Sequence, residues 1–319
     1  MRSAWIKWAR GVEHQQVLAR AVREFDFSKA YAYERTDNVG DVADPVVRVQ
    51  WRLKVLEPFP ERWGAVVGDV LTNLRAALDH TFWAAVMAHT GMPPKPQLVT
   101  FPLSVAHDKI FKDKVKNLRP LVAPEFWELV EAVQPFRSER PMDEPLEWLR
   151  WVSNADKHRA VRVIGQMAFD MGPVIFDGER YEMVEEARFT GPVEDDAVVA
   201  RLTFKRPVGG RSVNLVPTFA YSPVVQVGEE VDRVEPLHVV MEAMRRHVVD
   251  VVDKATAILG ARRPSLDELE LGMEHVAVAA ENAGVIATFR DQRGTVHRLD
   301  VPAGDEVRAA ARKWAGLPG

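Results

Sequence analysis

The stretch NLRAALDH, residues 73–80, carries side chains whose types and spacing suit chemistry. Arg75 and Asp79 have opposite charges four residues apart, so on a helix they lie one turn from each other and can form an ion pair. Asn73 and His80 lie about two turns apart on another flank, where they can line one groove. Two interpretations follow: a site for a ligand, or polar groups that tie a buried helix to its neighbours.

A second polar cluster, SNADKHR at residues 153–159, follows the apolar run LEWLRWV. One interpretation is capping of a helix C-terminus, because basic side chains there interact favourably with the helix dipole. The other is a second wall of the same polar site. Neither cluster has the ligand spacing of a metal-binding helix such as HExxH, so we expect no metal and no other cofactor.

Four short motifs follow one another along the chain: NLRAALDH at 73–80, FPL at 101–103, QPF at 134–136 and NADKHR at 154–159. In this order they resemble a large uncharacterised family of bacterial and phage proteins, whose members carry NLRxALDH, FPI, QPY and NxDKHR. The resemblance covers about residues 45–165. It implies no assigned activity.

Arg75 and His80 also resemble the motif of the HEPN superfamily of helical ribonucleases and nucleotide-binding modules, in which four to six residues separate an arginine from a histidine. In HEPN enzymes the arginine stabilises the phosphate charge, and the histidine helps activate the ribose 2′-hydroxyl without a metal. The resemblance implies a metal-independent ribonuclease or a toxin-like defence protein that acts on RNA or a nucleotide. Arg75 and His80 would then be catalytic, and the supporting residues would be Asn73, Asp79, Asn154, Asp156, Lys157, His158 and Arg159.

The HEPN resemblance also implies a homodimer. On an ideal helix the side chains of Arg75 and His80 diverge by about 140°, and HEPN proteins accommodate this by building the site between two protomers. The alternative hypothesis is a non-enzymatic binding or structural protein. In that case the Arg, Asp and His clusters only stabilise the helical core.

A helix over residues 61–90 must position the first cluster. Its apolar residues recur at helical spacing and define one buried stripe: Val67, Val70, Leu71, Leu74, Leu78, Phe82 and Ala85. The opposite side carries small or aromatic residues, so we expect the helix to be covered on nearly all sides.

The remaining elements are predicted from hydrophobic periodicity and turn residues. Trp5, Trp8, Val12, Leu18 and Val22 form the expected buried face of a helix over 3–26, and Gly260 is expected to end a helix over 236–259. The other helices are predicted at 105–118, 124–133 and 144–159. Strands are predicted at 30–35, 47–55, 160–169, 174–184, 198–205, 212–220 and 224–227.

These elements predict an α+β fold: a helical, bundle-like layer packed with an antiparallel β-sheet or small sandwich. We predict a main domain at 1–262, with a helical core at 61–160, a β-rich part at 161–235 and a closing helix at 236–260. Residues 263–319 are predicted to be a small C-terminal helix-hairpin-helix module, an α/β appendage in which Ser265 and Glu268 form a capping box.

The bulk composition is typical of globular proteins, with 47% hydrophobic and 28% charged residues in a chain of 319. The net charge of −4 gives no overall basic surplus for nucleic acid. The chain has no cysteine, which excludes disulfides and thiolate chemistry and fits a reducing cytoplasm. No apolar run has the length of a membrane span, so we expect a cytoplasmic protein that does not enter a membrane.

Overall fold

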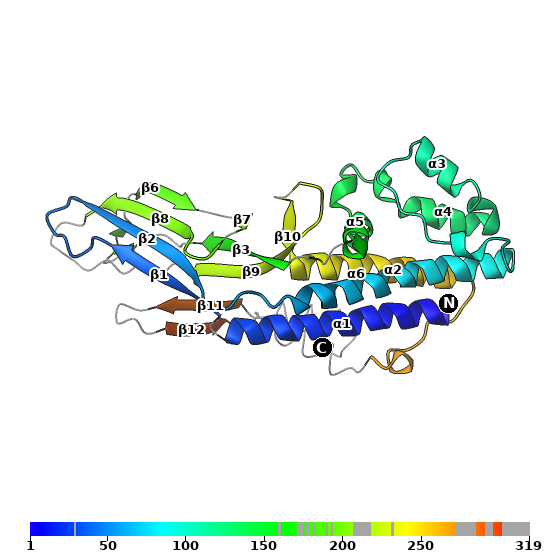
Figure 1. Ribbon diagram of the computed structural model, residues 1–319, viewed down its shortest axis with the longest axis horizontal. Helices are drawn as coiled ribbons and strands as arrows, with labels where there is room; N and C mark the ends of the chain where they lie inside the picture. The colour runs from blue at the N-terminus through cyan, green and yellow to red at the C-terminus, as the bar shows by residue number, and fades with distance from the viewer. Residues whose placement is uncertain are drawn as a thin grey trace. The chain divides into compact units, whose positions relative to one another are not determined.

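The protein has the predicted α+β class, with long helices and antiparallel sheets (Figure 1). It is represented by a computed structural model. The structure describes residues 1–28, 30–158, 161, 163–170, 175–176, 179–180, 183–188, 191–192, 194–206, 218–230, 233–271, 285–290 and 296–301. Within these residues, every helix is too short or too polar to cross a membrane.

The chain forms two compact units, each assembled from three separate stretches. The first unit comprises Met1–Val22, Pro60–Val163 and Val224–Met273. The second comprises Arg23–Phe59, Ile164–Pro223 and Glu274–Gly319. The domain limits given above from the sequence stay a prediction.

The helices form the body of the first unit, where α6 packs against α2, α4 and α5, and α2 packs against α5. Their bounds are close to those predicted, except that the third is much shorter than residues 105–118. The helices are α1 (Arg2–Phe27), α2 (Arg62–His89), α3 (Lys109–Val115), α4 (Pro124–Ala132), α5 (Pro145–His158) and α6 (Leu237–Ile258). Single 3-10 turns lie at Pro96–Leu98, Arg119–Leu121, Pro135–Arg137, Pro141–Asp143 and Asp267–Leu269.

The apolar stripe of α2 is buried as predicted, and all seven of its residues are at most 1% exposed. Two glycines on the same helix permit close approaches. A Cβ on Gly64 would lie 2.2 Å from the carbonyl oxygen of Val161, and a Cβ on Gly68 would lie 2.8 Å from both carboxylate oxygens of Asp156. The end of α5 and the chain after it therefore pass directly over the glycine face of α2.

The early tryptophans of α1 belong to the core of the first unit, as predicted. Trp5 is 1% exposed and donates through Nε1 to the hydroxyl of Thr256 at 3.0 Å. Trp8 is 5% exposed, and its Nε1 donates to the carbonyl of Arg245 at 3.3 Å. Burying each ring with its N–H bonded fixes α1 against α6. Val22 is half-buried and Val12 and Leu18 are buried.

The second unit contains an antiparallel sheet in the order β1-β2-β8-β6. These strands are β1 (Tyr31–Asp37), β2 (Val46–Val55), β6 (Met183–Arg188) and β8 (Val198–Lys205). A second sheet has the order β10-β9-β3-β7, with β3 at Val163–Asp170, β7 at Gly191–Pro192, β9 at Thr218–Gln226 and β10 at Val234–Pro236. Two hairpins pair β4 (Ile175–Phe176) with β5 (Glu179–Arg180), and β11 (Val285–Arg290) with β12 (Val296–Val301).

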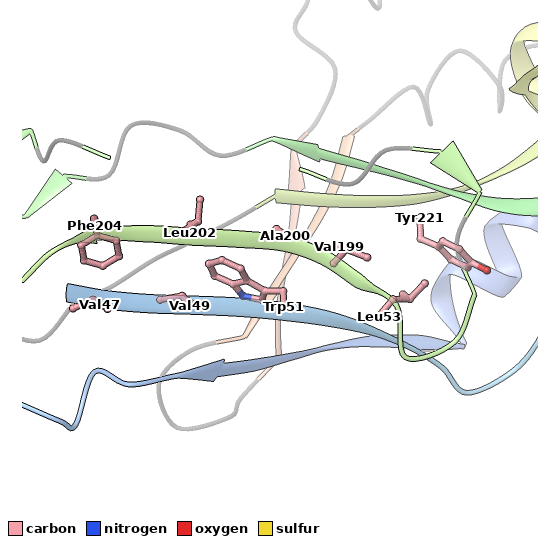
Figure 2. Packing of buried hydrophobic residues seen from close by; sticks show 9 residues of the cluster. All are labelled: Val47, Val49, Trp51, Leu53, Val199, Ala200, Leu202, Phe204 and Tyr221. Atoms are coloured by element: carbon pink, nitrogen blue, oxygen red, sulfur yellow. The ribbon is translucent and has the colours of Figure 1, made fainter. Parts of the chain in front are cut away.

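Strict alternation on β2 builds the core of the second unit. Val47, Val49, Trp51 and Leu53 are at most 3% exposed, while the residues between them are more exposed. Successive side chains of a strand point to opposite faces, so one face of β2 is buried. Figure 2 shows these side chains in one cluster with the apolar residues of the neighbouring strand β8 and with Tyr221.

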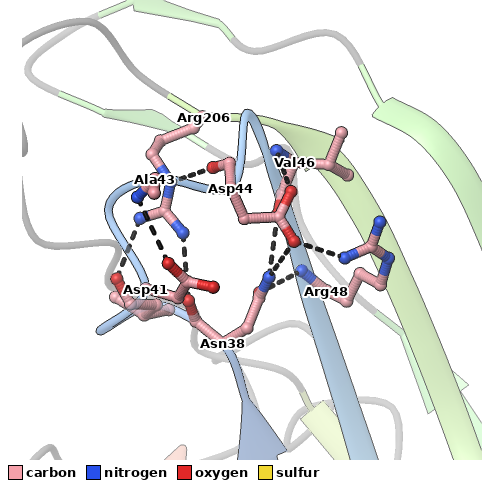
Figure 3. A network of polar contacts seen from close by, with 8 residues as sticks. Asn38, Asp41, Ala43, Asp44, Val46, Arg48 and Arg206 are labelled. Atoms are coloured by element: carbon pink, nitrogen blue, oxygen red, sulfur yellow. Dashed lines mark hydrogen bonds and ion pairs between the residues drawn. The ribbon is translucent and has the colours of Figure 1, made fainter.

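The aspartate-rich loop between β1 and β2 is held by a polar network (Figure 3). Asp44 accepts from the amide of Val46 at 2.9 Å, from Nδ2 of Asn38 at 2.9 Å and from Nη1 of Arg48 at 2.6 Å. The bond from the Val46 amide, followed by the bond from Arg48, lowers the pKa of Asp44. Arg206 donates to three loop carbonyls, those of Asn38, Val39 and Asp44. A guanidinium therefore occupies the centre of this loop.

Two strand predictions were wrong. A single strand was expected at 174–184, but the structure has the short β4–β5 hairpin there, followed by the start of β6. The Ser222–Pro223 pair was expected to separate two strands, but β9 runs through it. A proline lacks the N–H that a central strand donates. Pro223 is tolerated because β10 pairs with residues 224–226 and stops short of it.

The C-terminal hairpin and the capping box are confirmed. Ser265 and Glu268 exchange side-chain-to-amide bonds at 2.7 and 3.2 Å, at the start of the Asp267–Leu269 turn. Gly260, with a φ of +61°, follows the end of α6 as predicted. The capping box was expected to open another helix, but the described residues there form only the single 3-10 turn, and Glu270 after it has a φ of +58°. Residues 272–284 and the helix expected around Trp314 lie outside the described residues.

Candidate functional site

Arg75 and Asp79 form the predicted ion pair on α2 and also hold the backbone of Phe101. Nη2 of Arg75 lies 3.1 Å from Oδ1 of Asp79 and also donates to the carbonyl oxygen of Phe101. The same Oδ1 accepts from the Phe101 amide at 2.8 Å. The side chains of Arg75 and Asp79 are only 21% and 29% exposed. We call these three residues the Arg75 interlock, because both backbone groups of Phe101 are bound to one helix.

The segment at 101–103 is fixed by packing and by a second side chain. The ring of Phe101 is fully buried and lies edge-to-face on Phe82 of α2, with 6.2 Å between centroids. Gln134, which is 2% exposed, donates to the carbonyl of Pro102 at 2.8 Å and accepts from the amide of Ser104 at 3.0 Å. The NLRAALDH, FPL and QPF motifs therefore meet in one place.

Asn73 and His80 lie on another flank of α2, as the helical spacing predicted. Asn73 donates to the carbonyl of Asp69 at 2.9 Å, within its own helix. His80 is half-buried. Burial, followed by the positive charge of Lys7 on α1, lowers the pKa of His80, and Asp79 opposes this shift. A lowered pKa keeps the imidazole neutral at neutral pH, which is the form that can accept a proton.

The NADKHR cluster contributes one described carboxylate to the surroundings of α2. Asp156 lies against Gly68, and burial, followed by the negative charge of Asp69, raises the pKa of Asp156. Both causes disfavour the charged form, so this carboxylate is held close to α2 under electrostatic strain. Asp156 therefore lies near Asp69 rather than beside the Arg75 interlock.

The other residues of the NADKHR cluster lie on the last turns of α5 or just after this helix. Asn154 is exposed on α5, and the neighbouring Ser153 is 8% exposed. Lys157 and His158 complete the last turn of α5, and Arg159 lies outside the described residues. That Lys157, His158 and Arg159 line a common site with His80 stays a prediction.

Two basic residues were missed in the sequence: Lys114 on α3, which lies within electrostatic range of Arg75, and Arg150 on α5, which lies within electrostatic range of Lys114. Arg150 binds Glu147 through two bonds of 2.5 and 2.6 Å, and the Glu147 side chain is fully buried. Burial, followed by the charges of Arg75 and Arg150, lowers the pKa of Lys114. The spacing of Glu147 and Arg150 could have indicated their pairing. Nothing in the sequence indicates that Lys114 lies near Arg75 and Arg150.

The structure thus distributes the candidate residues over three places. Arg75 and Asp79 engage Phe101, within electrostatic range of Lys114, whereas Asp156 lies with Asp69 at Gly68. His80 occupies a third position near Lys7. Among the described residues, no group of three or more His, Asp or Glu side chains is arranged to hold a metal ion.

No family model, no curated protein and no solved structure matches this chain. The two resemblances drawn from the motifs therefore stay predictions.

Proposed function

We propose that this protein is a non-enzymatic binding protein, and that its Arg75 interlock stabilises the helical core instead of performing catalysis. The observation that carries the proposal is the bonding of Arg75. Its Nη2 is shared between Asp79 and the Phe101 carbonyl, and the guanidinium is largely buried. Both bonds use Nη2 and fix the orientation of the guanidinium against α2 and Phe101, whereas an arginine that stabilises a transferring phosphate must turn its N–H groups to the substrate. Freeing Arg75 would leave the Phe101 carbonyl without this donor and Asp79 without its counter-charge.

Replacing Asp79 tests this role. Asp79→Ala removes the acceptor for the Phe101 amide and for Arg75, and a buried group left without a partner costs about 1–3 kcal/mol. We expect the free energy of unfolding, measured in urea, to fall by about 2 kcal/mol. Asp69→Ala is the matched control, because Asp69 is an exposed aspartate on the same helix. It should change stability by no more than about 0.5 kcal/mol.

Cleavage of a labelled RNA oligomer by the wild type and by His80→Ala separates the non-enzymatic proposal from a ribonuclease. We expect no cleavage by the wild type. Cleavage that His80→Ala abolishes, with an unchanged melting temperature, would contradict the non-enzymatic proposal. Equal stability of Asp79→Ala and Asp69→Ala would contradict the role given to the interlock.

A HEPN-like, metal-independent ribonuclease or defence protein is the second candidate. The observation that favours it is the half-buried His80, whose lowered pKa suits a general base at neutral pH. This candidate requires a homodimer, with the site shared between two protomers and Arg75 released from Phe101. A cytoplasmic location and a bacterial or phage origin are part of the same proposal.

A further inference from the structure

A basic segment on the first unit has no part in the interlock. Residues 108–119 carry five basic and two acidic side chains, whereas the whole chain has a net charge of −4. The acid at the start, Asp108, caps α3 by accepting from the Phe111 amide at 2.9 Å. All five basic residues are exposed: Lys109, Lys112, Lys114, Lys116 and Arg119. Within the described part of the chain, no ion pair neutralises the four lysines.

The orientation of α3 is fixed by its apolar face. Phe111 is 2% exposed and Val115 is 8% exposed, so these residues anchor the helix to the body of the unit. Phe111 also lies edge-to-face on Phe136, with 5.2 Å between centroids. Anchoring this face inward leaves the lysines to solvent. Ile110 of α3 is 77% exposed, but a helix that inserts into a membrane surface must expose a whole apolar face, and Phe111 and Val115 are buried.

The inner edge of this segment meets two further cations. Lys114 lies within electrostatic range of Arg75 and Arg150, which come from α2 and α5. Partial burial, followed by the charges of Arg75 and Arg150, lowers the pKa of Lys114, and Asp79 opposes this shift. Arg75 and Arg150 are each paired with a carboxylate, Asp79 and Glu147, so an anion bound at this edge would be held by Lys114.

Planar side chains border the other edge. His107 is exposed and stacks on Phe136, with 5.0 Å between centroids and 24° between the ring planes. The guanidinium of Arg137 lies over the same Phe136 ring at 5.7 Å. Basic grooves with exposed planar side chains are the surfaces on which single-stranded nucleic acids bind, since phosphates contact the cations and bases stack on the rings.

We propose that this α3 surface, the five basic residues of 109–119 with His107 and Arg137 at its edge, binds the phosphate backbone of single-stranded nucleic acid. The surface includes none of the three residues of the Arg75 interlock, and the inference goes beyond the non-enzymatic role proposed above. The inference names a ligand for the proposed binding protein. It does not depend on the stability measured for Asp79→Ala.

Binding of labelled oligouridylate and oligothymidylate to the full chain, followed by fluorescence polarisation over a range of salt concentrations, tests this proposal. The probes should be about 20 nucleotides long, enough to cover one typical site. The test variant is Lys112→Ala/Lys114→Ala/Lys116→Ala. The matched control, Arg20→Ala/Lys205→Ala/Lys254→Ala, removes the same charge from exposed positions elsewhere.

We expect the wild type and the control to bind with similar affinity and similar salt dependence. Each phosphate contact to a single strand contributes about 0.7 to the slope of log affinity against log salt, so the test variant should lose about 2 from that slope. Its affinity should fall about tenfold or more at low salt. His107→Ala should weaken binding about fivefold with the slope unchanged, because stacking carries no charge.

Three results would overturn the proposal: no binding by the wild type, equal binding by the test and control variants, or binding to phosphatidylserine vesicles without binding to either oligonucleotide. Circular dichroism of each variant checks that the fold is retained. A negative result here leaves the test of the interlock unaffected, because none of these substitutions touches Asp79 or Phe101.

Discussion

Asp79 joins two parts of the first unit through a single oxygen atom. Its Oδ1 accepts from the guanidinium of Arg75 and from the amide of Phe101, while Arg75 donates to the Phe101 carbonyl. Charged groups form stronger hydrogen bonds than neutral ones, so a partly buried pair can hold a backbone segment firmly. At the scale of residues, Arg75 and Asp79 therefore hold the segment at 101–103 against α2.

The negative charge of the Asp156 carboxylate lowers the stability of the folded state. Burial and Asp69 raise its pKa, so the folded state binds a proton at this carboxyl more tightly than the unfolded state does. Its unfavourable contribution is therefore present at neutral pH and disappears as pH falls through the titration range. We predict that Asp156→Asn raises the free energy of unfolding at pH 7 by no more than about 0.5 kcal/mol, since water screens the charge.

Urea unfolding of Asp156→Asn and the wild type at pH 7 and near pH 3 measures this difference. The gain should vanish at the lower pH, where the carboxyl is protonated in both states. A gain that grows on acidification would show that the sign is wrong. His80 acts in the opposite direction, because its lowered pKa makes the wild type less stable as pH falls.

At the scale of elements, two glycines on α2 allow neighbouring segments to pack directly against this helix. The glycine at 64 lets the backbone at Val161 approach, and the glycine at 68 accommodates the Asp156 carboxylate. The apolar stripe of α2 was predictable because burial at a period of 3.6 residues leaves a clear pattern. The glycine contacts were not, since nothing in the sequence says which backbone passes over a glycine.

Gly64→Ala tests this close packing. The added methyl would lie 2.2 Å from a backbone oxygen, which cannot rotate away as a side chain can. We expect a loss of about 3 kcal/mol in the free energy of unfolding, at the upper end of the cost of overpacking. Gly40→Ala is the control, since nothing lies within 4 Å of the added atom. Equal stability of the two variants would contradict the proposed packing.

At the scale of the whole molecule, the α+β class and nearly all described helices were predictable from periodicity and turn residues. The two units were not, because each combines stretches far apart in the chain. The same holds for the site. The Arg75–Asp79 pair follows from its spacing, but its bonds to Phe101, and the position of Lys114 within electrostatic range of Arg75, depend on tertiary contacts.

Hydrogen exchange of the Phe101 amide, followed by NMR in the wild type and in Asp79→Ala, tests the central claim most directly. The Ser104 amide is the internal control, because it donates to Gln134 instead. We predict that protection of the Phe101 amide falls about tenfold or more in the variant, as expected for losing a bond worth about 1.4 kcal/mol. Protection at Ser104 should change much less. A Phe101 amide that is unprotected in the wild type, or equally protected in both proteins, would contradict the claim.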